Sequence, residues 1–142
     1  MAAATMGATS FQRGLGGMHA LAHSLGAMYD SHHGLLNAIL MPYVLKANEK
    51  AIAVQISRLS RYLQLSASDE TDDGFGYFFR WILAIRQQLN IPHTLAEIAI
   101  DVSQAQKIGE MAFNDASAIG NPISFSARQY SEIFKAAVQG KL

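Results

Sequence analysis

Four of the five histidines of this chain lie close together in the stretch GGMHALAHSLGAMYDSHHG, residues 16–34. Within this stretch His19 and His23 are four residues apart, so on a helix they share one face with Cβ atoms roughly 5–6 Å apart. Two imidazoles at that spacing can bind one metal ion, and His33 can join them if the chain folds back. Imidazole also carries protons near neutral pH. The residue types and their spacing therefore predict a metal site or an acid–base site.

The spacing alone leaves other interpretations open. Ala20 follows His19, whereas zinc proteases of the HExxH type carry a glutamate there as general base, so that class fits poorly. An isolated pair of histidines four residues apart arises about as often by chance as by function. The clustering of four histidines beside several glycines favours a functional site over chance. His93 stands alone after Pro92 and is interpreted as a surface or capping residue.

The elements that must position these histidines are predicted to be helices. Apolar residues recur at helical spacing over residues 3–11, 17–28, 34–47, 49–64, 73–89, 103–116 and from 126 to near the end. Pro42 is expected to kink or break the chain, and Ser103 and Ser126 are expected to be N-caps. No strand precedes Gly14, so the glycines that follow it are not a dinucleotide-binding loop. We expect residues 1–142 to form a single all-α, helical bundle-like domain of about seven helices.

Composition excludes several classes of protein. The net charge is zero and no basic run is present, which argues against a nucleic-acid partner. There is no cysteine, so disulfides and thiolate metal sites are excluded, and a cytoplasmic location is expected. No apolar run is long enough to span a membrane. Only 15% of the residues are charged, so we expect part of the surface to rest on another subunit, as in a homo-oligomer.

The histidine stretch, read in full, is more specific. Residues 14–38, GLGGMHALAHSLGAMYDSHHGLLNA, closely resemble the second signature of the iron-dependent (group III) alcohol dehydrogenases. AILMPYVLKAN at 38–48 resembles a buried helix of that family, DASAIGNP at 115–122 its late loop, and SARQYSEIFKAAV at 126–138 its last helix. The resemblance implies the C-terminal helical domain of the dehydroquinate synthase-like fold. It also implies that the nucleotide-binding domain and two metal ligands belong upstream of Met1.

The resemblance also implies roles for single residues. Two of the family's four metal ligands match His19 and His33, and the residue matching His23 lies beside the substrate as a candidate proton relay. His32 matches no fixed histidine of the family and is expected to be an exposed loop residue. Asp115 and Asn121 fall in the late loop and have only a weak claim to function.

The activity implied by the resemblance is that of an oxidoreductase. A divalent metal, Fe²⁺ or alternatively Zn²⁺, polarises the oxygen of a small alcohol or aldehyde, and hydride passes to or from NAD or NADP. These 142 residues keep two of the four ligands, so we expect weak metal binding and no dehydrogenase activity without the missing N-terminal half or another subunit. Two alternatives remain: a non-enzymatic helical interaction domain derived from a truncated or split dehydrogenase, and an unrelated three-histidine metal protein.

Overall fold

The computed structural model describes residues 1–12, 14–65 and 73–142, and it is helical almost throughout. In chain order the elements are α1 (Ala2–Phe11), α2 (Gly17–Tyr29), α3 (His33–Tyr62), α4 (Gly74–Gln88), the 3₁₀ helix η1 (Ala96–Ile98), α5 (Ala105–Asn114), the 3₁₀ helix η2 (Ala116–Gly120) and α6 (Ala127–Gln139). No strand occurs in these described ranges, and the prediction of an all-α fold is confirmed. The acidic stretch at 66–73 lies outside the described residues except for Asp73, which is the N-cap of α4.

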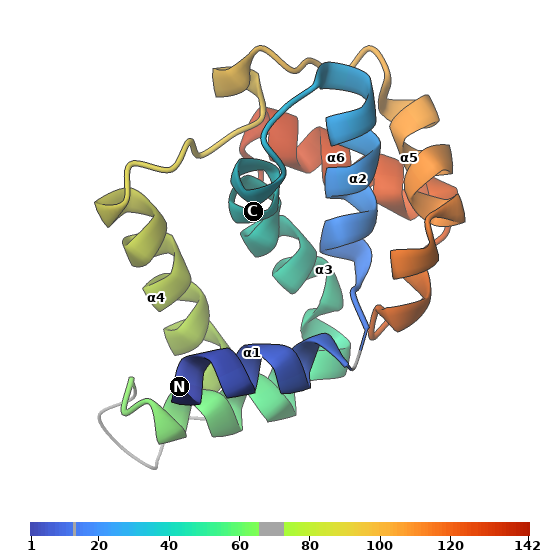
Figure 1. The fold of residues 1–142 in the computed structure, drawn as a ribbon. Coiled ribbons are helices and arrows are strands. Elements are labelled where there is room, and N and C mark those ends of the chain that lie inside the picture. The colour runs from blue at the N-terminus through green and yellow to red at the C-terminus, as the bar shows by residue number, and fades with distance from the viewer. Residues whose placement is uncertain (13, 66–72) are drawn as a thin grey trace.

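The core is enclosed by α2, α3, α5 and α6 (Figure 1). Helix α2 contacts α3 on one side and α5 on the other, and α5 packs along α6. The largest side chains that are fully buried in this core are Leu21, Leu25, Leu36, Ile39, Leu40, Ile108, Tyr130 and Phe134. Burial of a large apolar side chain stabilises the fold by about 1.5–3 kcal/mol. The helix that carries His19 and His23 therefore stands in the middle of the packed part of the molecule.

An amide network holds the first turn of α2 in place. The N–H of Gly17 donates to Oδ1 of Asn121 over 3.0 Å. Asn121 also pairs with Asn48 of α3 through two amide hydrogen bonds of 2.9 and 3.1 Å. A Cβ atom on Gly17 would lie 3.1 Å from that Oδ1 and 3.2 Å from Cε1 of Tyr130, which explains why the position is glycine. The network fixes α2 against α3 near His19.

Helix α3 differs from the prediction. It runs unbroken over residues 33–62, with Pro42 inside it, whereas two helices were expected at 34–47 and 49–64. Proline removes one backbone hydrogen bond, but Pro42 is fully buried, and its packing keeps the chain helical. The helix changes direction part-way along its length (Figure 1). Because the two predicted helices are one, the described residues contain six α-helices and two 3₁₀ helices rather than about seven helices.

Two predicted helix caps have opposite outcomes. Ser126 caps α6 in a reciprocal capping box with Gln129, as expected. Ser103 does not cap α5, whose N-cap is Gln104. The N–H of Ser103 donates instead to Oδ1 of Asp101 over 2.8 Å, because the aspartate two residues earlier forms its own local turn.

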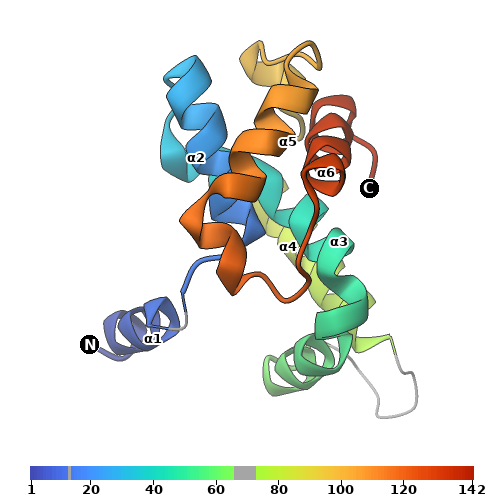
Figure 2. The same cartoon turned by 90° about the vertical axis from the view of Figure 1, so that its right-hand side faces the viewer.

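The outer helices carry apolar side chains that the core does not cover. Leu59 and Leu63 lie on the apolar face that helical spacing predicts for residues 49–64, yet each is 39% exposed, because the last part of α3 extends beyond the core. On α4, Phe75 and Phe78 are buried, whereas Trp81 is 37% exposed. Helix α1 has no buried residue, and Figure 2 shows it standing apart from the packed helices. No helix within the described parts of the chain is both long and apolar enough to cross a membrane.

Candidate metal and proton-transfer site

Three histidine rings come together where α2 meets the start of α3. His19 and His23 project from neighbouring turns of α2, and His33 is the first residue of α3. The centroids of the rings of His19 and His33 are 5.4 Å apart, those of His23 and His33 are 5.2 Å apart, and those of His19 and His23 are 6.0 Å apart. The turn after Tyr29, in which Asp30 adopts the left-handed conformation, reverses the chain and brings His33 back to α2.

The distances between the rings indicate which pairs could share one ion. Two imidazoles that share one ion through bonds of about 2.1 Å have centroids roughly 5 Å apart. The pairs His19 with His33 and His23 with His33 are both close to this separation, whereas His19 and His23 are further apart. His33 is thus within reach of an ion shared with either histidine of α2.

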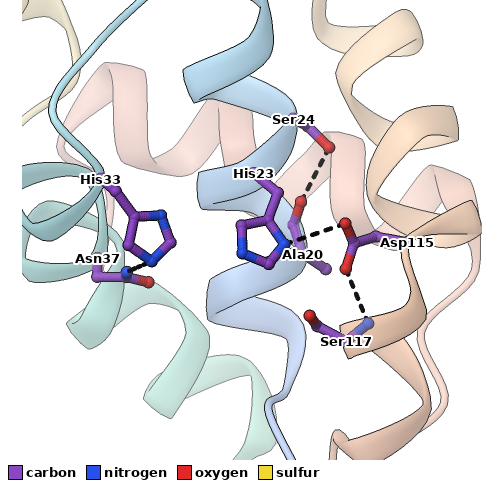
Figure 3. Close-up of polar contacts among 7 residues, drawn as sticks. All are labelled: Ala20, His23, Ser24, His33, Asn37, Asp115 and Ser117. Atoms are coloured by element: carbon purple, nitrogen blue, oxygen red, sulfur yellow. Dashed lines mark hydrogen bonds and ion pairs between the residues drawn. The ribbon is translucent and has the colours of Figure 1, made fainter.

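His33 has a neighbour on its own helix. Nδ2 of Asn37, one turn further along α3, lies 2.9 Å from Nε2 of His33 (Figure 3). Oδ1 of Asn37 is buried and has no hydrogen-bond partner. An ion bound at Nε2 would displace this amide contact, whereas Nδ1 has no such neighbour in the contacts of the described residues.

The environment of His19 favours its neutral form. Burial lowers the pKa of His19 below its ordinary value of 6.5, and the nearby His33 and His23 lower it further, while Asp115 acts in the opposite direction. A neutral imidazole is the form that binds a metal ion. The nitrogen donors at His19 and His33 thus have the chemistry that Fe²⁺ and Zn²⁺ accept.

His23 has a different partner from the other two histidines. Its Nδ1 lies 3.1 Å from Oδ2 of Asp115, which follows the last residue of α5 (Figure 3). The side chain of His23 is 41% exposed and that of Asp115 is 22% exposed. Sequence reasoning gave Asp115 only a weak claim to function, because nothing in the local sequence signals a contact with a residue 92 positions earlier.

The carboxylate of Asp115 is itself held in place. Its Oδ1 accepts a hydrogen bond of 2.8 Å from the N–H of Ser117, in the first turn of η2. Burial acts to raise the pKa of Asp115, but the hydrogen bonds from Ser117 and His23 outweigh burial and hold that pKa below its usual value. Asp115 is therefore ionised at neutral pH and can only accept hydrogen bonds.

A groove begins at this pair of residues. It encloses about 540 Å³ between α2 and α5, and its lining includes His23, Ala27, Lys107, Glu110 and Asp115. Ligand pockets typically measure about 300–1,000 Å³. A small molecule could thus lie along α5 with one end against His23.

His32 and His93, which were not assigned to the site, are both exposed, as expected. His32 caps α3, because its Nδ1 accepts from the N–H of Leu35 over 3.3 Å. Across residues 1–12, 14–65 and 73–142, no group of three or more His, Asp or Glu side chains is arranged to hold a metal ion. An ion held by His19 and His33 would therefore need further ligands from outside the described residues.

Comparisons with known proteins match the chain over nearly its whole length. Residues 1–138 match the model described as Fe-containing alcohol dehydrogenase family, C-terminal. Alcohol dehydrogenase 4 of Saccharomyces cerevisiae (strain ATCC 204508 / S288c) is 31% identical over 88% of the chain, and 1,3-propanediol dehydrogenase of Citrobacter freundii is 29% identical over 87%. The crystal structure of a 1,3-propanediol oxidoreductase superposes with a TM-score of 0.82 at 27% identity, over 87% of the chain. The chain spans only 32% of the length of each of these three proteins.

Proposed function

The chain belongs to the Fe-containing alcohol dehydrogenase family, of which it matches the C-terminal part, and we propose that it contributes half of a metal site to such a dehydrogenase. In this proposal His19 and His33 hold a divalent ion, Fe²⁺ or Zn²⁺. The observation that carries the proposal is the approach of these two rings from different helices, with 5.4 Å between their centroids. The substrate class is a small alcohol or aldehyde.

The chemistry of the reaction is divided between the absent groups and this chain. A bound divalent ion supplies Lewis-acid polarisation of the alcohol oxygen, and NAD or NADP supplies or accepts the hydride. His19 and His33 orient the ion. His23 lies beside them with its Nδ1 against the carboxylate of Asp115, and it takes up or returns the proton of the alcohol as a general acid–base group.

The 142 residues do not suffice for this activity by themselves. Two neutral imidazoles without a carboxylate bind a divalent ion weakly, and no nucleotide-binding motif is present in the sequence. We propose that the remaining ligands and the nucleotide site come from an N-terminal part or another subunit, and that the chain alone is inactive as a dehydrogenase. A cytoplasmic location fits the cysteine-free sequence.

Calorimetric titration of the full chain with Zn²⁺ tests the assignment of the ligands. The wild-type chain is expected to bind weakly, His19→Ala and His33→Ala to abolish the binding, and His23→Ala to retain it. His93→Ala is the matched control, because His93 is exposed and belongs to another part of the fold. Two results would refute the assignment. One is submicromolar one-to-one Zn²⁺ binding that is lost in His23→Ala, and the other is weak binding that is unchanged in His19→Ala and His33→Ala.

A second candidate function is a non-enzymatic interaction domain. The apolar side chains exposed on α1, α3 and α4 support it; those of Met6, Phe11, Val54, Tyr62 and Leu89 are each more than 60% exposed. Exposed apolar patches commonly mark protein interfaces. The same surface supports the proposal of a homo-oligomer, and light scattering of the purified chain distinguishes an assembly from a monomer.

A further inference from the structure

We propose that Asp115 is a positioning residue, which holds the ring of His23 with its proton on Nδ1 and its lone pair on Nε2, facing the side of His33. The catalytic meaning of this arrangement rests on the proposed function. The arrangement itself is a property of this chain, and it can be measured whether or not the chain is part of a dehydrogenase.

The contact with Asp115 decides which nitrogen of His23 carries the proton. A neutral imidazole has one N–H donor and one acceptor nitrogen, and the choice between them depends on the surroundings. Oδ2 of Asp115 lies 3.1 Å from Nδ1 of His23. An ionised carboxylate has no proton to donate, so the contact is a hydrogen bond only if Nδ1 is the donor. The lone pair of the neutral ring must then be on Nε2.

The carboxylate of Asp115 is held on both of its oxygens, so it can keep the ring of His23 in place. Asp115 is the N-cap of η2, and its other oxygen, Oδ1, accepts the N–H of Ser117 over 2.8 Å. Each carboxylate oxygen thus has a separate donor, and the backbone contact prevents the group from turning away from His23. A partner that is itself hydrogen-bonded fixes both the tautomer and the orientation of a histidine ring.

Nε2 of His23 points away from Asp115. Figure 3 shows the ring of His23 between Asp115 and His33, with its second nitrogen on the side of His33. The centroids of these two rings are 5.2 Å apart. The lone pair lies in the ring plane, so from Nε2 it is directed to the side of His33, into the space beside the proposed metal ligands, where an alcohol proton would have to be received.

A second carboxylate in the same groove provides a control. Glu110 also lines the groove, but its Oε1 accepts from Nε2 of Gln106 over 2.9 Å, and it has no hydrogen bond to His23. Glu110→Gln removes one negative charge from the groove without touching the contact between His23 and Asp115. Asp115→Asn removes the charge that demands a donor at Nδ1, and asparagine is as good an N-cap as aspartate, so η2 keeps its cap.

Nuclear magnetic resonance of the ring nitrogens tests the inference on the full chain, in the wild type, Asp115→Asn and Glu110→Gln. The spectra are recorded about two pH units above the ordinary histidine pKa of about 6.5, where free imidazoles are neutral. In the wild type and in Glu110→Gln, His23 is expected to be the Nδ1–H tautomer. In Asp115→Asn the exclusive Nδ1–H pattern is expected to be lost, while circular dichroism shows unchanged helix content.

Two results would overturn the inference: an Nε2–H tautomer of His23 in the wild type, or an unchanged tautomer in Asp115→Asn. The wild-type spectrum alone decides the first, so the inference stays testable if the variant fails to fold. The metal titration fails or succeeds independently, because it depends on His19 and His33. A failure of the proposed function is thus distinguishable from a failure of this inference.

Discussion

At the scale of single residues, three histidines of similar sequence context have three different surroundings. His19 is partly buried and disfavoured as a cation, His33 contacts Asn37, and His23 contacts the carboxylate of Asp115. The pair that the sequence suggests most directly, His19 and His23, has the most widely separated rings of the three, at 6.0 Å. Chemistry at this site therefore depends on the partner of each ring more than on the spacing of the histidines.

The lowered pKa of Asp115 predicts a dependence of stability on pH. Because this pKa is lower in the folded chain, the carboxylate stabilises the fold above its unfolded pKa of about 3.8, and the contribution is lost as the pH falls through the folded value. Asp115→Asn is expected to cost about 1 kcal/mol at pH near 7, the usual worth of a hydrogen bond. Urea unfolding measures this difference, which should shrink below a pH of about 4. A difference that grows on acidification would contradict the prediction.

At the scale of elements, glycine sets how closely α5 and α6 approach. A Cβ atom on Gly109 would collide with the carbonyl oxygen of Ala127 and would lie 3.0 Å from the backbone nitrogen of Ser131. Both of these neighbours belong to α6, and backbone atoms cannot move aside without shifting the helix. Since Asp115 follows the end of α5, the position of α5 also sets the position of Asp115 relative to His23.

Gly109→Ala is therefore expected to destabilise the fold by about 1–3 kcal/mol, the usual cost of overpacking. Chemical denaturation monitored by circular dichroism measures the change in the free energy of unfolding. Gly7→Ala is the matched control, because Gly7 is also within a helix but has nothing within 4 Å of the added Cβ atom. Alanine at Gly7 should leave the stability of the core unchanged or raise helix content slightly. Equal decreases in the free energy of unfolding in Gly109→Ala and Gly7→Ala would show that the α5–α6 contact is not tight.

At the scale of the whole molecule, the chain is well packed at one end and open at the other. The core around α2, α3, α5 and α6 contrasts with α1, none of whose residues is buried. The chain spans 32% of the length of relatives such as alcohol dehydrogenase 4. The apolar side chains of α1 and of the outer part of α3 remain exposed, Phe11 by 68% and Tyr62 by 83%.

Complementation tests this division of the enzyme. The segment of a full-length relative that precedes the matched part is coexpressed with this chain, and reduction of a nicotinamide cofactor by a small alcohol is followed by absorbance. Activity is expected only when both parts and a divalent metal are present, and His19→Ala in this chain should abolish it. Activity of the chain alone, or of the mixture with His19→Ala, would contradict the proposed sharing of the metal site.

Much of the secondary structure was predictable because its signals are local. Apolar periodicity located the helices around residues 17–28, 73–89 and 126–138, and Ser126 was recognised as a cap from its own type and position. The division into two helices at 34–47 and 49–64 was wrong, since α3 is continuous over residues 33–62 and contains Pro42, which is buried in the core. Local periodicity also fails for Leu59 and Leu63, because their exposure depends on where the core ends.

The sequence by itself determined that the chain is all-α and that it resembles one end of an iron-dependent dehydrogenase, and it predicted a site at the histidines between residues 19 and 33. Only the tertiary structure decided which rings face one another, and that Asp115, 92 residues further along the chain, meets His23. The reason is physical. Helix formation depends on contacts within a few residues, whereas ring orientation and the choice of hydrogen-bond partner depend on how distant helices pack.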